Sequence, residues 1–245
     1  MPDDIPPPPL SLLDGAALFL DFDGTLVELA EAPDAIRVPG ELAGLLRSLA
    51  ARLEGRLALV SGRALADLDR HIRCPGVAVS GSHGLELRLA DGRVLPVARP
   101  EALDAAREEI RRFAEGGGGG LIVEEKPASV AVHFRRAPER EAAVAALVDR
   151  LAARTGLVVQ RGKMVAELRP AGADKGDALA ALMKEPHFAG ARPLFMGDDL
   201  TDEHAFEAAA ALGGAGVLVG PKRETAARYR LPGVAEVARW LRGSA

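Results

Sequence analysis

Two carboxylates that can do chemistry together, Asp21 and Asp23, lie two residues apart at the end of the apolar run 17–20. Gly24 and Thr25 follow them. One carboxylate can bind a metal ion and attack phosphorus while the other transfers a proton. Phosphoryl transfer also needs cations on the phosphate oxygens, and Mg²⁺ binds proteins through one or two carboxylates. The pair therefore predicts phosphoryl transfer, and the competing interpretation is an ordinary turn after a strand.

Three other segments carry polar groups that suit a phosphate or a metal ion. They are Ser61-Gly62-Arg63 after the apolar run 57–60, Asp174-Lys175-Gly176 at the start of a helical pattern, and Gly197–Asp202 after the run 194–196. A cation at a helix start is unfavourable to the helix dipole, so contact with a phosphate would explain Lys175. Asp202 can serve as a helix cap, and crowded acids repel each other unless a cation is present. A plain loop or a solvated lysine explains each segment alone, whereas their combination predicts a phosphoryl-transfer centre.

The elements that must position these residues are short apolar runs alternating with helical patterns. The runs cover 17–20, 57–60, 77–79, 194–196 and 217–219, and helical spacing covers 40–53, 174–184 and 202–212. Continuous apolar runs suit strands that are buried on both faces. The alternation predicts an α/β fold with a doubly wound parallel sheet. Ligands bind beyond the carboxyl ends of such strands, and Asp21, Ser61 and Asp198 fall there.

The middle of the chain follows another order, in which a helix and two strands occur twice. The helices are expected at 101–114 and 139–153, and the strands at 121–126, 129–135, 157–161 and 164–169. We expect an α+β cap domain at 98–170, inserted between the core segments 16–97 and 171–245, with a flexible glycine loop at 116–120. Period-two alternation places Ser129, His133 and Arg135 on an open sheet face that suits a polar substrate with many hydroxyls. An interior histidine, or a surface ion pair of Glu167 with Arg169, is the plainer interpretation.

Composition excludes several classes of function. The chain has 245 residues, 48% of them hydrophobic, and a net charge of −4 without a block of Lys or Arg. Aromatic residues make up only 4%, so we expect no nucleic-acid partner. No apolar run approaches the ~20 residues that cross a membrane. Cys74 is the single cysteine, which fits a reducing compartment, and we expect a cytoplasmic protein with a mobile Pro-rich arm at 1–15.

Together the four polar segments resemble the motifs of the haloacid-dehalogenase-like (HAD) phosphatase superfamily. The resemblance implies that Asp21 is the nucleophile, forming an aspartyl-phosphate, and that Asp23 is the general acid and then the base. It implies that Ser61 and Lys175 hold the phosphoryl group. The implied cofactor is Mg²⁺, and its expected ligands are Asp21, the main-chain carbonyl of Asp23, Asp198 and Asp202, with Asp199 as an alternative to Asp202.

Further segments are similar to the trehalose-6-phosphate phosphatase family. They are residues 81–86, 125–129, 133–135, 162–170, 174–176 and 197–203, and the resemblance covers about 16–241. The sugar contacts that it implies are Lys126, Ser129, His133 and Glu167, with Arg169 assisting. The remaining candidates for substrate binding are Gly62, Arg63, His83, Glu86, Arg135 and Lys163. Phe134 stands where the family often has Tyr, and alternation points it toward the covering helices.

Three functions remain open on the sequence alone. The first is hydrolysis of trehalose 6-phosphate in trehalose biosynthesis, with a trehalose-6-phosphate synthase as the functional partner. The second is the same chemistry on another sugar phosphate, such as sucrose 6-phosphate or mannosyl-3-phosphoglycerate. The third is a non-catalytic phosphosugar sensor or partner subunit. The intact pair of Asp21 and Asp23 argues against a sensor, because a sensor needs no carboxylate for proton transfer.

Overall fold

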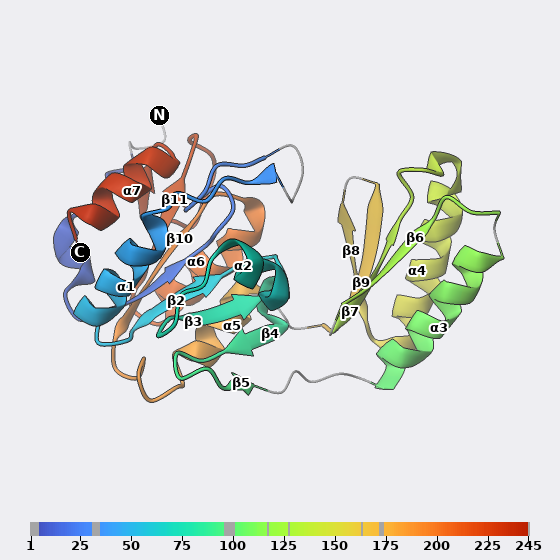
Figure 1. The fold of residues 1–245 in the computed structure, drawn as a ribbon, viewed down its shortest axis with the longest axis horizontal. Coiled ribbons are helices and arrows are strands. Elements are labelled where there is room, and N and C mark those ends of the chain that lie inside the picture. Colours follow the sequence, from blue (N-terminus) through green and yellow to red (C-terminus); the bar gives the residue numbers. More distant parts are fainter. Residues whose placement is uncertain are drawn as a thin grey trace. The chain divides into compact units, whose positions relative to one another are not determined.

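The computed structural model describes residues 5–30, 35–95, 101–116, 118–126, 128–162, 164–171 and 174–244. The chain divides into two compact units, which Figure 1 shows as a ribbon. The core unit comprises Met1–Pro96 and Ala173–Ala245, and the cap unit comprises Val97–Gly172. None of the described helices is both long and apolar enough to cross a membrane.

The core unit is built on an eight-stranded sheet of order β12-β11-β10-β1-β2-β3-β4-β5. The strands are β1 Ala16–Leu20, β2 Leu57–Val60, β3 Ala78–Gly81, β4 Glu86–Arg88, β5 Val94–Leu95, β10 Arg192–Gly197, β11 Ala215–Val219 and β12 Tyr229–Leu231. Neighbours from β12 to β3 pair in parallel, and β4 and β5 add an antiparallel edge. Every residue of β1, β2 and β11 is buried, as continuous apolar runs predict for strands covered on both faces.

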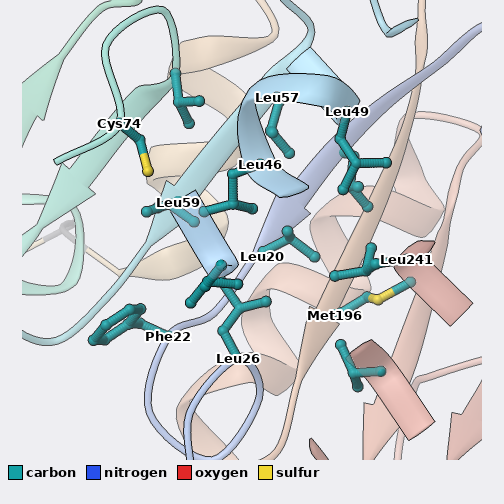
Figure 2. Close-up of a cluster of buried hydrophobic side chains, with 14 of the residues drawn as sticks. Leu20, Phe22, Leu26, Leu46, Leu49, Leu57, Leu59, Cys74, Met196 and Leu241 are labelled. Atoms are coloured by element: carbon teal, nitrogen blue, oxygen red, sulfur yellow. The ribbon is translucent and has the colours of Figure 1, made fainter. Parts of the chain in front are cut away.

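Helices cover both faces of this sheet. They are α1 Leu42–Arg52, α2 Leu65–His71, α5 Lys175–Leu182, α6 Glu203–Ala211 and α7 Val234–Arg242, with short 3₁₀ helices at Leu10–Leu13, Ser82–Gly84 and Leu200–Asp202. Figure 2 shows Leu46 of α1 and Leu241 of α7 in one buried cluster with Leu20 and Met196 of the sheet. Phe19 points to the opposite face, into a second cluster with residues of α5 and α6. The predicted doubly wound α/β core is confirmed.

The Pro-rich arm, which the sequence predicts to be mobile, contacts the core unit in its described part. In its described part, the carbonyl of Pro8 accepts a hydrogen bond from the indole of Trp240 at 2.8 Å. The carbonyl of Pro6 accepts one from the Arg230 amide at 3.0 Å, and Leu13 is buried in the core. These contacts tie parts of residues 5–13 to the core unit, and the mobility of the arm stays a prediction. Proline lacks an amide donor but keeps its carbonyl acceptor, and a buried indole needs such a partner.

The cap unit is a four-stranded antiparallel sheet of order β6-β7-β9-β8, formed by β6 Ile122–Lys126, β7 Ser129–His133, β9 Val165–Arg169 and β8 Val158–Gly162. One face is covered by α3 Glu101–Glu115 and α4 Glu141–Thr155, with a 3₁₀ turn at Pro138–Arg140. Ile110, Val132, Leu147 and Leu168 belong to its buried hydrophobic cluster. The predicted α+β arrangement is confirmed, and Figure 1 shows both helices on the same side of the sheet.

Two details of the cap unit concern residues named from the sequence. Phe134 is buried in the hydrophobic cluster, as alternation predicts. Arg135 is exposed in a turn because β7 already ends at His133, so its predicted place on the open strand face is wrong. In the predicted glycine loop, the described Gly118–Gly120 all have positive φ, which other residues rarely adopt.

Candidate active site

The carboxyl ends of three parallel strands bring the predicted chemical groups to one edge of the core sheet. Asp21 follows β1, Ser61 follows β2 and Asp198 follows β10. Leu20 pairs with Met196 on one side and with Leu59 on the other, so the residues that follow them emerge side by side. The amide of Asp21 donates to the carbonyl of Met196 at 2.9 Å, which fixes the start of the aspartate loop.

Three carboxylates form an acid cluster at this edge: Asp21, Asp198 and Asp202. One oxygen from each lies within 4.8 Å of the others, an arrangement that can hold a metal ion. The buried Lys175 ammonium donates to Asp21 Oδ1 and to Asp202 Oδ1, both at 2.7 Å. Buried charges persist when they are paired and hydrogen-bonded, so Lys175 stabilises the ionised form of two carboxylates that burial disfavours.

The pKa values of the acid cluster show how crowded it is. Burial raises the pKa of Asp21 to about 7 although Lys175 lowers it, and burial with the charge of Asp21 raises the pKa of Asp202 to about 7. Burial and the neighbouring Asp202 raise the pKa of Asp198 to about 6. Burial opposes the charge of Lys175, but the two carboxylates raise its pKa on balance. When all three carboxylates are ionised, they and the one ammonium leave two negative charges, which fits a divalent cation with oxygen ligands.

Lys175 is aimed by the start of α5. The Asp177 amide donates to Asp174 Oδ1 at 2.9 Å, and the Asp174 amide donates to Asp177 Oδ2 at 3.2 Å. This capping box satisfies amides that the helix itself leaves unpaired. The first helical turn is thereby fixed, and its first residue points at the acid cluster. The unfavourable place of a cation at a helix start is offset by the two carboxylates that it contacts.

A second capping box separates the roles of Asp199 and Asp202. Asp199 Oδ1 accepts hydrogen bonds from the amide and hydroxyl of Thr201 at 2.7 and 2.6 Å. Asp202 Oδ2 accepts from the Asp199 amide at 3.0 Å, which leaves Oδ1 to Lys175. Asp202 thus belongs to the acid cluster and to the cap at once. Among the described residues Asp199 is not in that cluster.

Two glycines make room for the acids. A Cβ atom on Gly24, whose φ is 81°, would lie 2.1 Å from Asp198 Oδ2. A Cβ atom on Gly197 would lie 2.2 Å from Asp202 Cγ. No real Cβ approaches so closely, so both positions need glycine for the carboxylates to meet. The sequence pattern marked Gly24 as part of a motif, but nothing local indicated what Gly197 accommodates.

Arg63 binds the second motif aspartate directly. Its Nε and Nη2 donate to Asp23 Oδ2 and Oδ1 at 2.6 and 2.8 Å, a bidentate contact. A third hydrogen bond joins Nη1 to Asp67 at 2.8 Å. The hydrogen bonds to Asp23 raise the pKa of Arg63, so the guanidinium stays charged. Predicted as a substrate contact, Arg63 is placed by the structure where it orients Asp23.

The remaining predicted core residues lie around Ser61. The Arg63 amide donates to Ser61 Oγ at 3.1 Å, and Ser61 is fully buried. A Cβ atom on Gly62 would lie 2.6 Å from the imidazole of His83, so this glycine allows His83 to pack on the loop. Glu86 Oε2 accepts from Ser82 Oγ at 2.7 Å and from the first amide of α2 at 3.1 Å. That carboxylate supports the loop and the helix, and its contact with substrate stays a prediction.

The open face of the cap sheet gathers the predicted sugar contacts. Glu167 accepts from Lys126 Nζ at 3.2 Å and from Ser129 Oγ at 2.5 Å. His133 Nε2 lies 2.9 Å from Glu124, and Gln160 pairs with Glu167 in register. The sequence reasoning missed Glu124 and Gln160, although alternation extended to β6 and β8 would have placed both on this face. Arg169 follows two residues after Glu167 on the same strand, and Lys163 is outside the described residues.

Comparisons with known proteins agree with this geometry. The trehalose-phosphatase family model matches residues 19–235. A probable trehalose-phosphate phosphatase from Sinorhizobium fredii is 43% identical, with 85% of this chain and 79% of that protein covered. The trehalose-6-phosphate phosphatase of Escherichia coli is 39% identical, with 92% and 85% covered. A crystal structure of the Aspergillus fumigatus trehalose-6-phosphate phosphatase aligns with a TM-score of 0.72 at 26% identity over 98% of both chains. The chain therefore belongs to the trehalose-phosphatase family, as the sequence motifs predicted.

Proposed function

We propose that this protein hydrolyses trehalose 6-phosphate to trehalose and inorganic phosphate with Mg²⁺ as its cofactor. The observation that carries the chemistry is the buried Lys175, which bridges Asp21 and Asp202 at 2.7 Å inside an acid cluster. The substrate is proposed from the family and from the names of the relatives. A trehalose-6-phosphate synthase is the proposed source of that substrate.

Asp21 acts as the nucleophile in this mechanism. Its carboxylate oxygen forms a bond to phosphorus while the bond from phosphorus to the sugar oxygen breaks, leaving an aspartyl-phosphate. Asp23 must carry a proton to give it to the departing sugar oxygen, so one of its two oxygens leaves Arg63 and is protonated before this step. Asp23 then takes a proton from the attacking water as the bond to Asp21 breaks. Phosphate leaves, and both aspartates return to their starting states.

The other core residues hold the phosphoryl group and the metal ion. Lys175 and Ser61 bind the phosphoryl oxygens, and Asp21, the main-chain carbonyl of Asp23, Asp198 and Asp202 would hold Mg²⁺. When bound, the metal neutralises negative charge on the transferring group. Gly24 is essential to this set because its missing Cβ leaves space for Asp198.

The cap residues select the sugar in this proposal, because the core chemistry suits many phosphomonoesters. Lys126, Ser129 and Glu167 form a hydrogen-bonded cluster in which Ser129 is fully buried and the side chains of Lys126 and Glu167 are 23% and 17% exposed. A buried polar site of this kind rejects a sugar that leaves its groups unpaired. His133 and Arg169 complete the proposed sugar contacts.

A panel of substrates tests the proposal. Phosphate release would be measured from trehalose 6-phosphate, sucrose 6-phosphate and mannosyl-3-phosphoglycerate, each with Mg²⁺ and with EDTA. We expect the highest kcat/KM for trehalose 6-phosphate, and its loss in EDTA. Preference for either other sugar phosphate would reject the substrate but keep the chemistry. Full activity of an Asp21→Asn variant would reject the proposed nucleophile, and binding without turnover by the native protein would indicate a sensor.

A further inference from the structure

A buried arginine on the covered side of the cap sheet contacts the hairpin that carries two proposed sugar contacts. Arg107 lies on α3 and is only 7% exposed. Its Nη2 donates to the main-chain carbonyl of Lys126 and, at 3.2 Å, to that of Ser129. These two residues end β6 and begin β7, and they pair with each other in register. One guanidinium therefore joins both sides of the hairpin turn.

The side chains of this hairpin point the other way. Lys126 Nζ and Ser129 Oγ both donate to Glu167 on the open face of the sheet. A guanidinium is planar and fixed, so two carbonyls bound to one nitrogen cannot move apart freely. A buried carbonyl that loses its hydrogen-bond donor costs free energy. The contact with Arg107 therefore favours the one hairpin geometry in which the guanidinium reaches both carbonyls. Arg107 thus binds the main chain of Lys126 and Ser129 on the covered face of the sheet, while their side chains contact Glu167 on the open face.

We propose that Arg107 is a positioning residue for sugar specificity, acting through the main chain of Lys126 and Ser129. This inference rests on the proposed function, in which the open face of the cap sheet binds the sugar. The guanidinium need not touch substrate at all. Its effect is to keep an ammonium and a hydroxyl at the spacing that a disaccharide requires, because a site that is loose by about 1 Å loses much of its binding energy.

The neighbouring turn of α3 supplies a matched control. Arg111 is also on α3 and pairs with Glu125 Oε1 at 2.6 Å and with Glu108 Oε2 at 2.6 Å. Its side chain is 46% exposed, and its described hydrogen bonds go to carboxylates rather than to the hairpin carbonyls. Exposed pairs of this kind contribute little. An Arg111→Gln variant removes a cation from the same helix and its pair with the Glu125 side chain of β6, but leaves both hairpin carbonyls bound to Arg107.

The test compares a sugar phosphate with a small aryl phosphate in Arg107→Met, Arg107→Lys and Arg111→Gln. We expect Arg107→Met to raise KM for trehalose 6-phosphate about 10-fold, equivalent to about 1.4 kcal/mol. Its kcat/KM for p-nitrophenyl phosphate, which lacks the sugar, should stay within about 2-fold of the native value. The KM of Arg107→Lys for trehalose 6-phosphate should lie between those of the native enzyme and Arg107→Met, because an ammonium can still donate to one carbonyl. Arg111→Gln should match the native enzyme for both substrates.

A double-mutant cycle separates positioning from general stability. If Arg107 acts through Lys126, then Arg107→Met should raise KM much less in a Lys126→Ala background than in the native one. Equal effects in the two backgrounds, or an unchanged KM in Arg107→Met, would overturn the proposal. Thermal melting shows whether Arg107→Met unfolds the cap unit. If it does, the folded Arg107→Lys variant is used instead, and a KM equal to that of the native enzyme would overturn the proposal. A native enzyme that prefers another sugar phosphate refutes only the proposed substrate, since the cycle is then run with that sugar.

Discussion

Replacement of Lys175 by Met probes the electrostatics of the acid cluster. The native ammonium donates to Asp21 and Asp202 at 2.7 Å, and its side chain is 4% exposed. Methionine has a similar length but neither charge nor donors, so Lys175→Met leaves two buried carboxylates facing each other. Activity should be lost because the phosphoryl group loses its cation, but stability gives the quantitative test.

The magnitude follows from the two hydrogen bonds. Each bond to a charged group contributes about 1.5–3 kcal/mol, and removal of one partner from a buried ion pair destabilises by about 3–5 kcal/mol. Burial already raises the pKa of Asp21 and of Asp202 to about 7, so proton uptake relieves part of the repulsion. We therefore expect Lys175→Met to lower the free energy of unfolding by about 3 kcal/mol in EDTA, at the low end of that range.

Urea unfolding followed by fluorescence measures this difference in the core unit. Trp240 is the single tryptophan and belongs to the core cluster, so its emission reports on that unit. Added Mg²⁺ should reduce the loss of stability in Lys175→Met, because the more negative site of the variant binds the cation more tightly. Lys184→Met, an exposed change near the end of the same helical segment, should stay within about 0.5 kcal/mol of native. Equal stability of the two variants in EDTA would refute the buried bridge between Asp21 and Asp202.

Three further outcomes follow from particular contacts. Gly24→Ala should weaken Mg²⁺ binding about 10–100-fold, because the added Cβ displaces a carboxylate of the acid cluster. Gly55→Ala is the control, since Gly55 has a similar φ of 83° with open space around it, and it should bind Mg²⁺ like the native protein. Equal affinities of the two variants in calorimetry would contradict this. Asp23→Asn should slow turnover of trehalose 6-phosphate about 10²–10⁴-fold. The effect on p-nitrophenyl phosphate should be smaller, because its leaving group departs without a proton. Equal losses of turnover on the two substrates would argue against Asp23 as the general acid. Removal of residues 1–9 should shift the emission of Trp240 to the red and lower stability by about 1 kcal/mol, because the indole loses its acceptor. An unchanged spectrum would mean that the arm does not pack there.

The core of the site was predictable because strand ends of a parallel sheet meet at one edge. Asp21, Ser61 and Asp198 each follow an apolar run, and that rule alone places them together. Alternation likewise predicted that Ser129 and Phe134 point to opposite sides of the cap sheet. These inferences depend only on local periodicity, which a single sequence contains.

Contacts between distant segments were not predictable in the same way. Arg63 and Asp23 are 40 residues apart, and a loop arginine carries no sign of the carboxylate that it binds. Arg107 occupies a helical position that reads as a solvated charge, yet it is buried because a turn of the sheet needs a donor. The contacts of the arm are of the same kind, because the carbonyl of Pro8 meets Trp240 of α7 and the carbonyl of Pro6 meets Arg230 of β12.

The most direct test of the central claim is rapid-quench mass spectrometry with trehalose 6-phosphate. Acid quenching within the first turnover would trap the covalent intermediate, and the peptide that contains Asp21 would be weighed. We predict the added mass of one phosphoryl group on that peptide in the presence of Mg²⁺, and none in EDTA or in Asp21→Asn. Release of phosphate from trehalose 6-phosphate by native enzyme and Asp21→Asn alike, with no phosphorylated peptide, would contradict the proposed chemistry at Asp21.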